Sequence, residues 1–335
     1  MTDPTDTPEA LDVVGIGNAL VDVLSHEEEG FLESNALVKA SMALIDTNRA
    51  ESLYAEMGAG IEASGGSAAN TIAGVASFGG TAAYIGRVRD DQLGAVFAHD
   101  LRAAGVLYRS PAATDGPPTG RCLIVVTPDA ERTMSTYLGS SELLGPEYVD
   151  PELIAAAQIT YLEGYLFDRA PAQEAYWKAS QTAHDAGRRV SLTLSDTFCV
   201  ERHRSEWRQL VADQVDVLFA NEEEAKALYE VDTFEAALVA ARKDVEVAVL
   251  TCGANGSVIA RGDEVVQVPA HPVDQVVDTT GAGDLYAAGF LYGLTRERSL
   301  EDCGRLGSVA ASAVIAHTGA RPNVSLAQLA GSLGL

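Results

Sequence analysis

The chain has little positive charge and little cysteine, and each shortage excludes a class of function. Its 335 residues contain 23 lysines and arginines against 48 aspartates and glutamates, which gives a formal net charge of −25. An electrostatic field of this sign repels polyanions, so we expect neither nucleic acid nor an anionic membrane as a partner. The 4 cysteines form no CxxC pair and no disulfide framework, which favours a reducing, cytoplasmic setting.

Long apolar runs and two common nucleotide motifs are also missing. No uncharged apolar stretch reaches the length that crosses a bilayer. Residues 1–10 are polar and acidic, which predicts a flexible tail rather than a signal peptide. The absence of any Gly-Lys pair excludes a Walker A loop. A dinucleotide fingerprint that begins at Gly15 and Gly17 fails because Leu20 stands at its third glycine position.

Short apolar runs alternate with helical patterns along the chain. Strands are expected at Val13–Ile16, Leu123–Val126, Ile159–Leu162, Val190–Leu194, Val215–Phe219 and Val247–Thr251. Helices are expected at Ala68–Phe78, Asp91–Ala104, Ala172–Ala186, Glu222–Tyr229, Phe234–Ala241, Gly283–Leu294 and Asp302–Ala316. This order predicts one α/β domain over 11–335, with a mostly parallel sheet flanked by helices on both faces. Segments near 20–46 and 119–138 fit the alternation poorly, and we expect them to form a small β-rich lid.

The run Asp278–Asp284 (DTTGAGD) leads directly into an apolar helical segment and carries the strongest chemical signal. The first turn of a helix has unpaired amides and the positive end of the helix dipole, so it attracts anions. A carboxylate there repels phosphate unless it accepts a proton from a hydroxyl that attacks phosphorus, which predicts Asp284 as a base. The amides of Gly281, Ala282 and Gly283 would then stabilise the transferring group. The alternative is that Asp284 only begins the helix.

Asp22 and Asn70 suggest how an acceptor with hydroxyl groups binds. Asp22 ends a predicted strand, and Asn70 lies in the first helical turn after Gly65 and Gly66. Paired glycines let a ligand approach the backbone closely. A carboxylate accepts hydrogen bonds from two vicinal hydroxyls, and an amide both donates and accepts, which is what recognition of ribose requires. Capping or turn formation is the alternative for both residues.

Five motifs, in their order along the chain, resemble those of the ribokinase-like (PfkB-type) carbohydrate and nucleoside kinases. They are Gly15–Asp22, Gly65–Asn70, Asn221–Glu224, Thr251–Gly256 and Asp278–Asp284. The resemblance runs from about Val13 to about Pro322, which is nearly the whole chain. The opening Gly-x-Gly-Asn-x-x-x-Asp and the stretch from Phe31 to Asp46 are most similar to the adenosine kinases and their bacterial relatives.

The resemblance implies an ATP-dependent kinase that transfers the γ-phosphoryl group to the 5′-hydroxyl of a nucleoside, adenosine first, in purine salvage. A sugar kinase for ribose, fructose or a keto-sugar acid remains an alternative, as does a nucleoside-binding protein that has lost catalysis. ATP and Mg²⁺ are the implied cofactors, and K⁺ is a further one because many members of the family respond to it. A monomer or a homodimer is expected.

The family pattern also implies a set of site residues. The acceptor side comprises Asn18, Asp22, Gly65, Gly66, Asn70 and Glu163. The nucleotide side comprises Asn221, Thr251, Gly253, Gly256 and His317. Asn221 and Glu224 would place Mg²⁺ through water, and Asp278 with Thr280 would lie near K⁺. None of the chain's 4 lysines lies in a phosphate motif, so Arg132 is expected to neutralise the transferring phosphate. Local alternatives are a capping box for Asn221–Glu224, a plain turn at Thr251–Gly256 and a structural role for His317.

Overall fold

The computed structural model describes residues 10–129 and 131–335, so the expected tail lies outside the described residues except for Ala10. A nine-stranded sheet with the order β14-β13-β12-β11-β10-β9-β1-β5-β6 forms its centre. Its strands are β1 (Leu11–Ile16), β5 (Ala82–Ile85), β6 (Val106–Tyr108), β9 (Ala157–Glu163), β10 (Arg189–Thr193), β11 (Val217–Asn221), β12 (Val247–Thr251), β13 (Ser257–Arg261) and β14 (Glu264–Val268). Strands from β12 to β6 pair in parallel, and β13 and β14 extend the sheet as an antiparallel hairpin.

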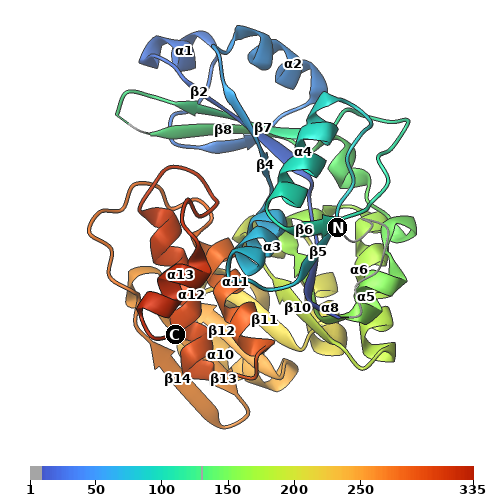
Figure 1. The fold of residues 1–335 in the computed structure, drawn as a ribbon, viewed down its shortest axis with the longest axis vertical. Helices are drawn as coiled ribbons and strands as arrows, with labels where there is room; N and C mark the ends of the chain where they lie inside the picture. Colours follow the sequence, from blue (N-terminus) through green and yellow to red (C-terminus); the bar gives the residue numbers. More distant parts are fainter. Residues whose placement is uncertain (1–9, 130) are drawn as a thin grey trace.

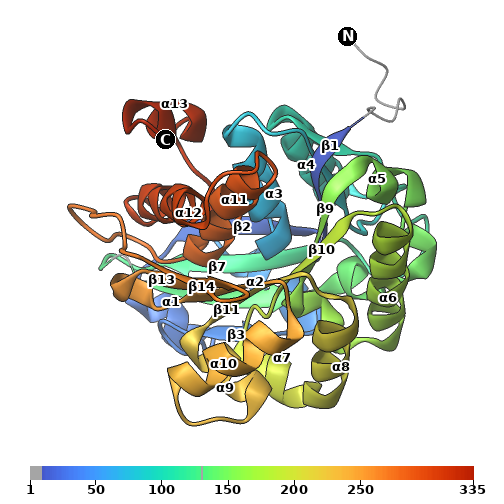
Figure 2. The ribbon, with the colours of Figure 1, turned by 90° about the horizontal axis from the view of Figure 1, so that it is seen from below.

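Helices cover both faces of this sheet because its inner strands are apolar on both sides. Successive residues of β11 alternate between two separate cores, with Val217 and Phe219 in one and Leu218 and Ala220 in the other. The first core is closed by α3 (Ser67–Ser77), α4 (Gln92–Ala103), α11 (Ala282–Leu294), α12 (Leu300–Ile315) and α13 (Leu326–Ser332). The second is closed by α5 (Pro151–Ala156), α6 (Ala170–Asp185), α7 (Thr197–Arg202), α8 (Arg204–Gln214), α9 (Glu222–Tyr229) and α10 (Phe234–Asp244) (Figure 2).

A second, five-stranded sheet with the order β3-β8-β7-β2-β4 stands over one end of the large sheet (Figure 1). Its strands are β2 (Leu20–His26), β3 (Met42–Leu44), β4 (Ile61–Gly65), β7 (Gly120–Val126) and β8 (Arg132–Tyr137). The two segments expected to form a lid supply four of these five strands. The strand predicted at Leu123–Val126 therefore belongs to this sheet and not to the large one.

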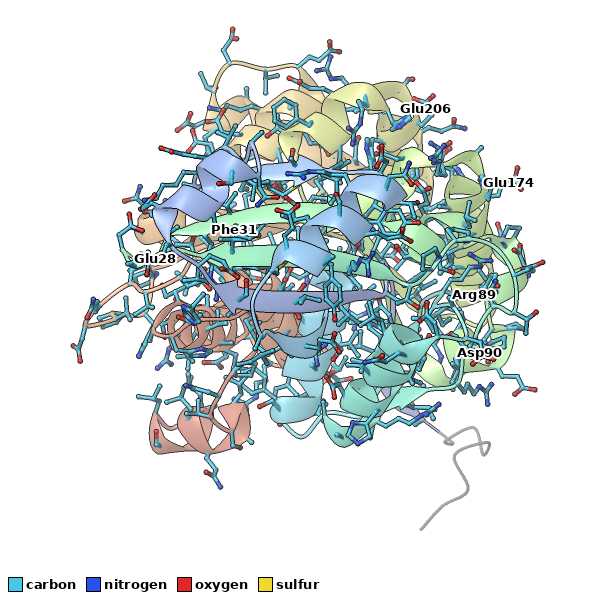
Figure 3. The ribbon with its side chains drawn as sticks, turned by 90° about the horizontal axis from the view of Figure 1, so that it is seen from above. Glu28, Phe31, Arg89, Asp90, Glu174 and Glu206 are labelled. Atoms are coloured by element: carbon cyan, nitrogen blue, oxygen red, sulfur yellow. The ribbon has the colours of Figure 1, made fainter. Side chains whose placement is uncertain are left out.

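Two helices, α1 (Glu29–Ser34) and α2 (Thr47–Glu56), lie on the outer side of the small sheet. Figure 3 looks onto them from above, with Glu28 and Phe31 marking the beginning of α1. Short 3₁₀ turns at η1 (Gly139–Leu143), η2 (Pro146–Tyr148), η3 (Gly164–Asp168) and η4 (Gly253–Asn255) complete the described elements. None of the described helices is both long and apolar enough to cross a membrane.

The carboxyl ends of the parallel strands bring separate parts of the sequence to one edge. Glu163 ends β9, Asn221 ends β11 and Thr251 ends β12, while Ser195 follows the end of β10. Open parallel sheets bind their ligands at this edge. All four residues line one cavity.

Candidate active site

A cavity of about 730 Å³ separates the small sheet from the strand ends of the large sheet. From the small sheet it is lined by Leu20, Asp22, Met42, Leu44, Cys122, Ile124, Met134 and Thr136. From the main body it is lined by, among others, Ser67, Asn70, Glu163, Asn221, Glu224, Thr251 and the turn Thr279–Asp284. The fold therefore brings the motifs of the acceptor side and the nucleotide side to one place.

Asp284 lies in the first turn of α11 and lines the cavity. The Ser67 hydroxyl donates to its Oδ1 at 2.6 Å, and the Asn70 amide Nδ2 donates to its Oδ2 at 3.1 Å. Burial raises the pKa of Asp284 above its ordinary value, and these two hydrogen bonds partly oppose the shift. A carboxylate held in this way, with a raised proton affinity, is suited to accept a proton from an alcohol.

The turn before α11 offers free backbone amides beside the cavity, although they are not all of the predicted ones. The Ala282 amide donates to the Thr279 carbonyl at 3.2 Å, so its N–H is already used within the turn. Over the described residues, no protein acceptor takes a hydrogen bond from the amides of Gly281, Gly283 and Asp284. These three amides replace the predicted set of Gly281, Ala282 and Gly283. Gly281 has a left-handed φ of 80°, and a Cβ on Gly283 would meet no atom within 4 Å, which leaves open space beside the turn.

Asp22 faces the same cavity from strand β2. Burial raises the pKa of Asp22 to about 6, against the lowering influence of Arg321 and Arg132, and the charge of Asp284 raises it further. A Cβ on Gly65 would lie 2.4 Å from the Asp22 Cγ, so this glycine makes room for the carboxylate. The adjacent Gly66 has a φ of 97°, and its Cβ would lie 2.3 Å from the Asn18 carbonyl oxygen. The glycine pair therefore lets two segments of the acceptor side pack closely.

Glu163 joins two segments of the acceptor side by hydrogen bonds. Its Oε1 accepts from the Asn18 amide at 3.1 Å and from the Asn18 Nδ2 at 2.8 Å, and its Oε2 accepts from the Ala68 amide at 2.7 Å. The side chain is 1% exposed, and burial raises its pKa to about 7. Both carboxylate oxygens are therefore engaged by the protein. Glu163 thereby joins the loop after β1 to the beginning of α3, and because its side chain also lines the cavity, its contact with the acceptor stays a prediction.

Arg132 does not line the cavity, contrary to the expectation that it neutralises the transferring phosphate. Its Nη1 lies 2.8 Å from Asp278 Oδ2, and both side chains are nearly buried. The Asp278 carboxylate also accepts from the Gly319 amide at 2.9 Å and from the Thr280 amide at 3.0 Å. Although burial raises the pKa of Asp278, these hydrogen bonds and Arg132 outweigh it and lower the pKa. A guanidinium group bound to this carboxylate disfavours a second cation there, so Asp278 and Thr280 do not fit a K⁺ site through that side chain.

Asn221 and Glu224 begin helix α9 as a complete capping box. The Glu224 amide donates to Asn221 Oδ1 at 2.9 Å, and the Glu224 carboxylate accepts from the Asn221 amide at 2.9 Å and from its Nδ2 at 2.7 Å. Burial raises the pKa of Glu224 to about 7. Carboxylate oxygens have further lone pairs, so this pair fits a Mg²⁺ ion held through water, which stays a prediction. The described residues contain no group of three or more His, Cys, Asp or Glu side chains that would hold a metal directly.

The remaining nucleotide-side residues divide into two groups. Thr251 lines the cavity, whereas Gly253, Gly256 and His317 are not among its lining residues. Gly253 and Gly256 have left-handed φ values of 56° and 87°, which the turn between β12 and β13 requires. His317 Nδ1 lies 3.0 Å from the Thr318 carbonyl, and its Nε2 is buried without a partner among the described residues.

Sequence reasoning missed three residues of the site. Ser67 binds Asp284, and the Arg321 Nε donates to Asn70 Oδ1 at 3.2 Å. Ser195 has a left-handed φ of 67°, and its Oγ accepts from the Gly164 amide at 3.0 Å. Arg321 had a usable signal, since it is a cation in a cation-poor chain and lies four positions after His317, which was predicted for the nucleotide side.

A buried carboxylate of raised proton affinity beside free backbone amides suits an alcohol that attacks phosphorus. Together with the two-sheet α/β fold, this defines the class of the protein as a phosphotransferase that acts on hydroxyl groups. The pfkB family carbohydrate kinase model matches residues 35–326, and the chain belongs to this family.

Solved structures and curated proteins agree with that family. The crystal structure of adenosine kinase from Sinorhizobium meliloti is 52% identical, with a TM-score of 0.89 over 96% of this chain and 99% of that chain. A probable sugar kinase protein from Rhizobium etli CFN 42 is 51% identical, with a TM-score of 0.90 over 98% of this chain and 99% of that chain. Adenosine kinase 2 of Arabidopsis thaliana is 26% identical over 340 residues, which cover 92% of this chain and 94% of that protein.

Proposed function

We propose that this kinase transfers the γ-phosphoryl group of ATP to the 5′-hydroxyl of a nucleoside, and that adenosine is the preferred acceptor. One observation carries the choice of a nucleoside. Apolar side chains that are unusually exposed line the cavity, with Met42 48% exposed, Leu44 54% and Phe198 73%. A flat base would cover such side chains, whereas a free sugar offers them little apolar surface. The names of the adenosine kinase relatives support the same choice.

In the proposed reaction the acceptor's ribose hydroxyls bind Asp22 and Asn70. The 5′-hydroxyl then attacks the γ-phosphorus of ATP in line, the new O–P bond forms, and the bond to the bridging oxygen breaks to release ADP. Asp284 takes the proton of the 5′-hydroxyl as the hydroxyl oxygen attacks the phosphorus. The amides of Gly281, Gly283 and Asp284 stabilise the negative charge on the transferring group.

The cofactors of this proposal are ATP and Mg²⁺. When bound, Mg²⁺ neutralises and orients the phosphates. Asn221 and Glu224 would hold it through water, in keeping with their capping box and their place on the cavity wall. K⁺ is left out of the proposed set because the Asp278 carboxylate is already bound by Arg132. We further propose that the enzyme acts in the cytoplasm in purine salvage, as a monomer or a homodimer.

An acceptor panel tests the proposal. The purified chain is supplied with ATP and Mg²⁺ and offered adenosine, other nucleosides, ribose, fructose and a keto-sugar acid, with ADP release as the rate and product mass as the identity. Asp284→Asn is the matched control for contaminating kinases. Adenosine 5′-monophosphate as the main product is the expected result. A higher kcat/KM for any sugar would overturn the nucleoside assignment and support the sugar kinase alternative, which the relative from Rhizobium etli favours.

A further inference from the structure

We propose that Arg321 is a positioning residue of this kinase, which orients the Asn70 amide toward the catalytic carboxylate and supplies the positive charge that Asp22 needs to bind the acceptor. Arg321 lies between the end of α12 and α13, outside every motif that the sequence analysis assigned to the acceptor. It is not among the residues that line the cavity, so it acts through its neighbours. The inference rests on the proposed function for the identity of the acceptor.

The first half of the proposal follows from a short chain of hydrogen bonds. The Arg321 Nε donates to Asn70 Oδ1 at 3.2 Å, and Asn70 Nδ2 donates to Asp284 Oδ2 at 3.1 Å. An amide has one acceptor end and one donor end. Reversing it would place the NH₂ group against the guanidinium and the oxygen against the carboxylate, and both contacts would be repulsive. Arg321 therefore fixes which end of Asn70 faces Asp284.

The second half follows from the charges around Asp22. Burial is the largest influence on the pKa of Asp22. The charged or titratable groups that face it are Arg321 before α13, Arg132 on β8, Asp284 on α11 and Cys122 on β7. Arg321 opposes the effect of burial on the Asp22 pKa more strongly than Arg132 does. Arg132 is already paired with Asp278, which leaves Arg321 as the more available compensating charge.

Arg321 is enclosed by the protein and keeps one donor unused. Its pKa is lowered from its ordinary value, chiefly by burial, although an arginine keeps its charge in proteins. Its Nη2 is buried and has no hydrogen-bond partner within the described part of the chain. Burial of a charged group with an unused donor is unfavourable. Such a placement is typical of a residue retained for the charge it supplies to a site.

The test compares Arg321→Gln, which removes the charge, with Arg321→Lys, which keeps it. Arg305→Gln is the matched control, because Arg305 lies on α12, its side chain is 48% exposed, and it pairs with Asp302 at 3.6 Å on the same helix. For each variant, kcat, both KM values and the pH profile of kcat/KM for the best acceptor of the panel are measured, and circular dichroism monitors folding. The panel itself decides the acceptor, so a sugar acceptor would refute the nucleoside assignment while leaving Arg321 testable.

For Arg321→Gln we expect the acceptor KM to rise about tenfold, as for other residues that orient a binding group, with the KM for ATP unchanged. The acidic limb of the profile should move up by about one pH unit, because loss of a nearby cation raises a carboxyl pKa. Arg321→Lys should keep the acidic limb of the wild-type pH profile, because the charge remains. Its kcat should fall about tenfold, because the Nε donor to Asn70 is gone.

Three results would overturn the proposal. They are a wild-type acceptor KM and acidic limb in Arg321→Gln, an acidic limb in Arg321→Lys that moves as far as in Arg321→Gln, and an effect of equal size in Arg305→Gln. Should Arg321→Gln fail to fold, the kcat of Arg321→Lys decides, since a wild-type value would show that the guanidinium geometry does not position Asn70.

Discussion

Replacing Gly65 by alanine should separate acceptor binding from nucleotide binding. The new Cβ would lie 2.4 Å from the Asp22 Cγ and from its Oδ1, whereas ordinary contact begins at about 3.4 Å. Gly65 does not have a positive φ, so the backbone tolerates alanine. The carboxylate is the free end of a side chain, so it should yield by roughly 1 Å while the fold persists. A displacement of that size at a binding group reduces kcat/KM by about 10²-fold.

The assay is the rate of ADP release, with the acceptor and ATP each titrated at saturating concentrations of the other. We expect the acceptor KM to rise and kcat to fall, while the KM for ATP is unchanged and the Tm stays close to wild type. Gly331→Ala is the matched control, because a Cβ there would meet no atom within 4 Å. A Gly65→Ala enzyme with wild-type acceptor kinetics and an intact fold would refute the reasoning that Asp22 holds the acceptor.

Four further predictions concern charge. Asp284→Asn should lower kcat by about 10²–10⁴-fold with the fold intact, since a general base contributes that much, and steady-state kinetics check it. Because burial raises the pKa of Asp22 to about 6 and of Glu163 to about 7, kcat/KM should fall as the pH drops through about 6. The Tm of the ligand-free protein should instead rise as the pH is lowered from about 7.5 to about 5.5, because carboxyls with raised pKa bind more protons in the folded than in the unfolded state. Finally, replacing KCl with tetramethylammonium chloride should leave the rate unchanged, because Arg132 already binds Asp278; a strong loss of rate would contradict this.

The long elements of the fold were predictable because their patterns are local. Strands β9 and β12 are continuous apolar runs, and α11 follows a glycine turn and remains apolar, so each was expected within a few residues of its observed bounds. The short strands β5 and β6 and the β13–β14 hairpin were not predicted. A four-residue run such as Ala82–Ile85 has too few residues for a period, and its pairing with β1 is a long-range property.

The site shows the same division between local and long-range information. Asp284, Asp22 and Asn70 were predicted because each belongs to a recognisable local motif, and the fold brings them to one cavity. The partner of Arg132 was not predictable, since Asp278 is more than a hundred positions away in the sequence. The ion pair forms only when strand β8 packs near the turn before α11. The engaged amide of Ala282 likewise depends on turn geometry that residue types do not specify.

The acidity that excluded nucleic acid at the level of the sequence also narrows the choice of acceptor. The charged side chains that line the cavity are Asp22, Glu163, Asp168, Asp196, Arg202, Glu224 and Asp284, so six are acidic and one is basic. Arg202 is already bound to Asp168 at 2.7 Å. An acceptor with its own negative charge, such as a keto-sugar acid, would meet uncompensated repulsion there, whereas a neutral nucleoside or sugar would not. In the proposed reaction the nucleotide differs, because Mg²⁺ would neutralise its phosphates and the free amides of the turn would bind them. The acidic lining therefore favours an uncharged alcohol as acceptor and a phosphoryl donor that carries its own cation.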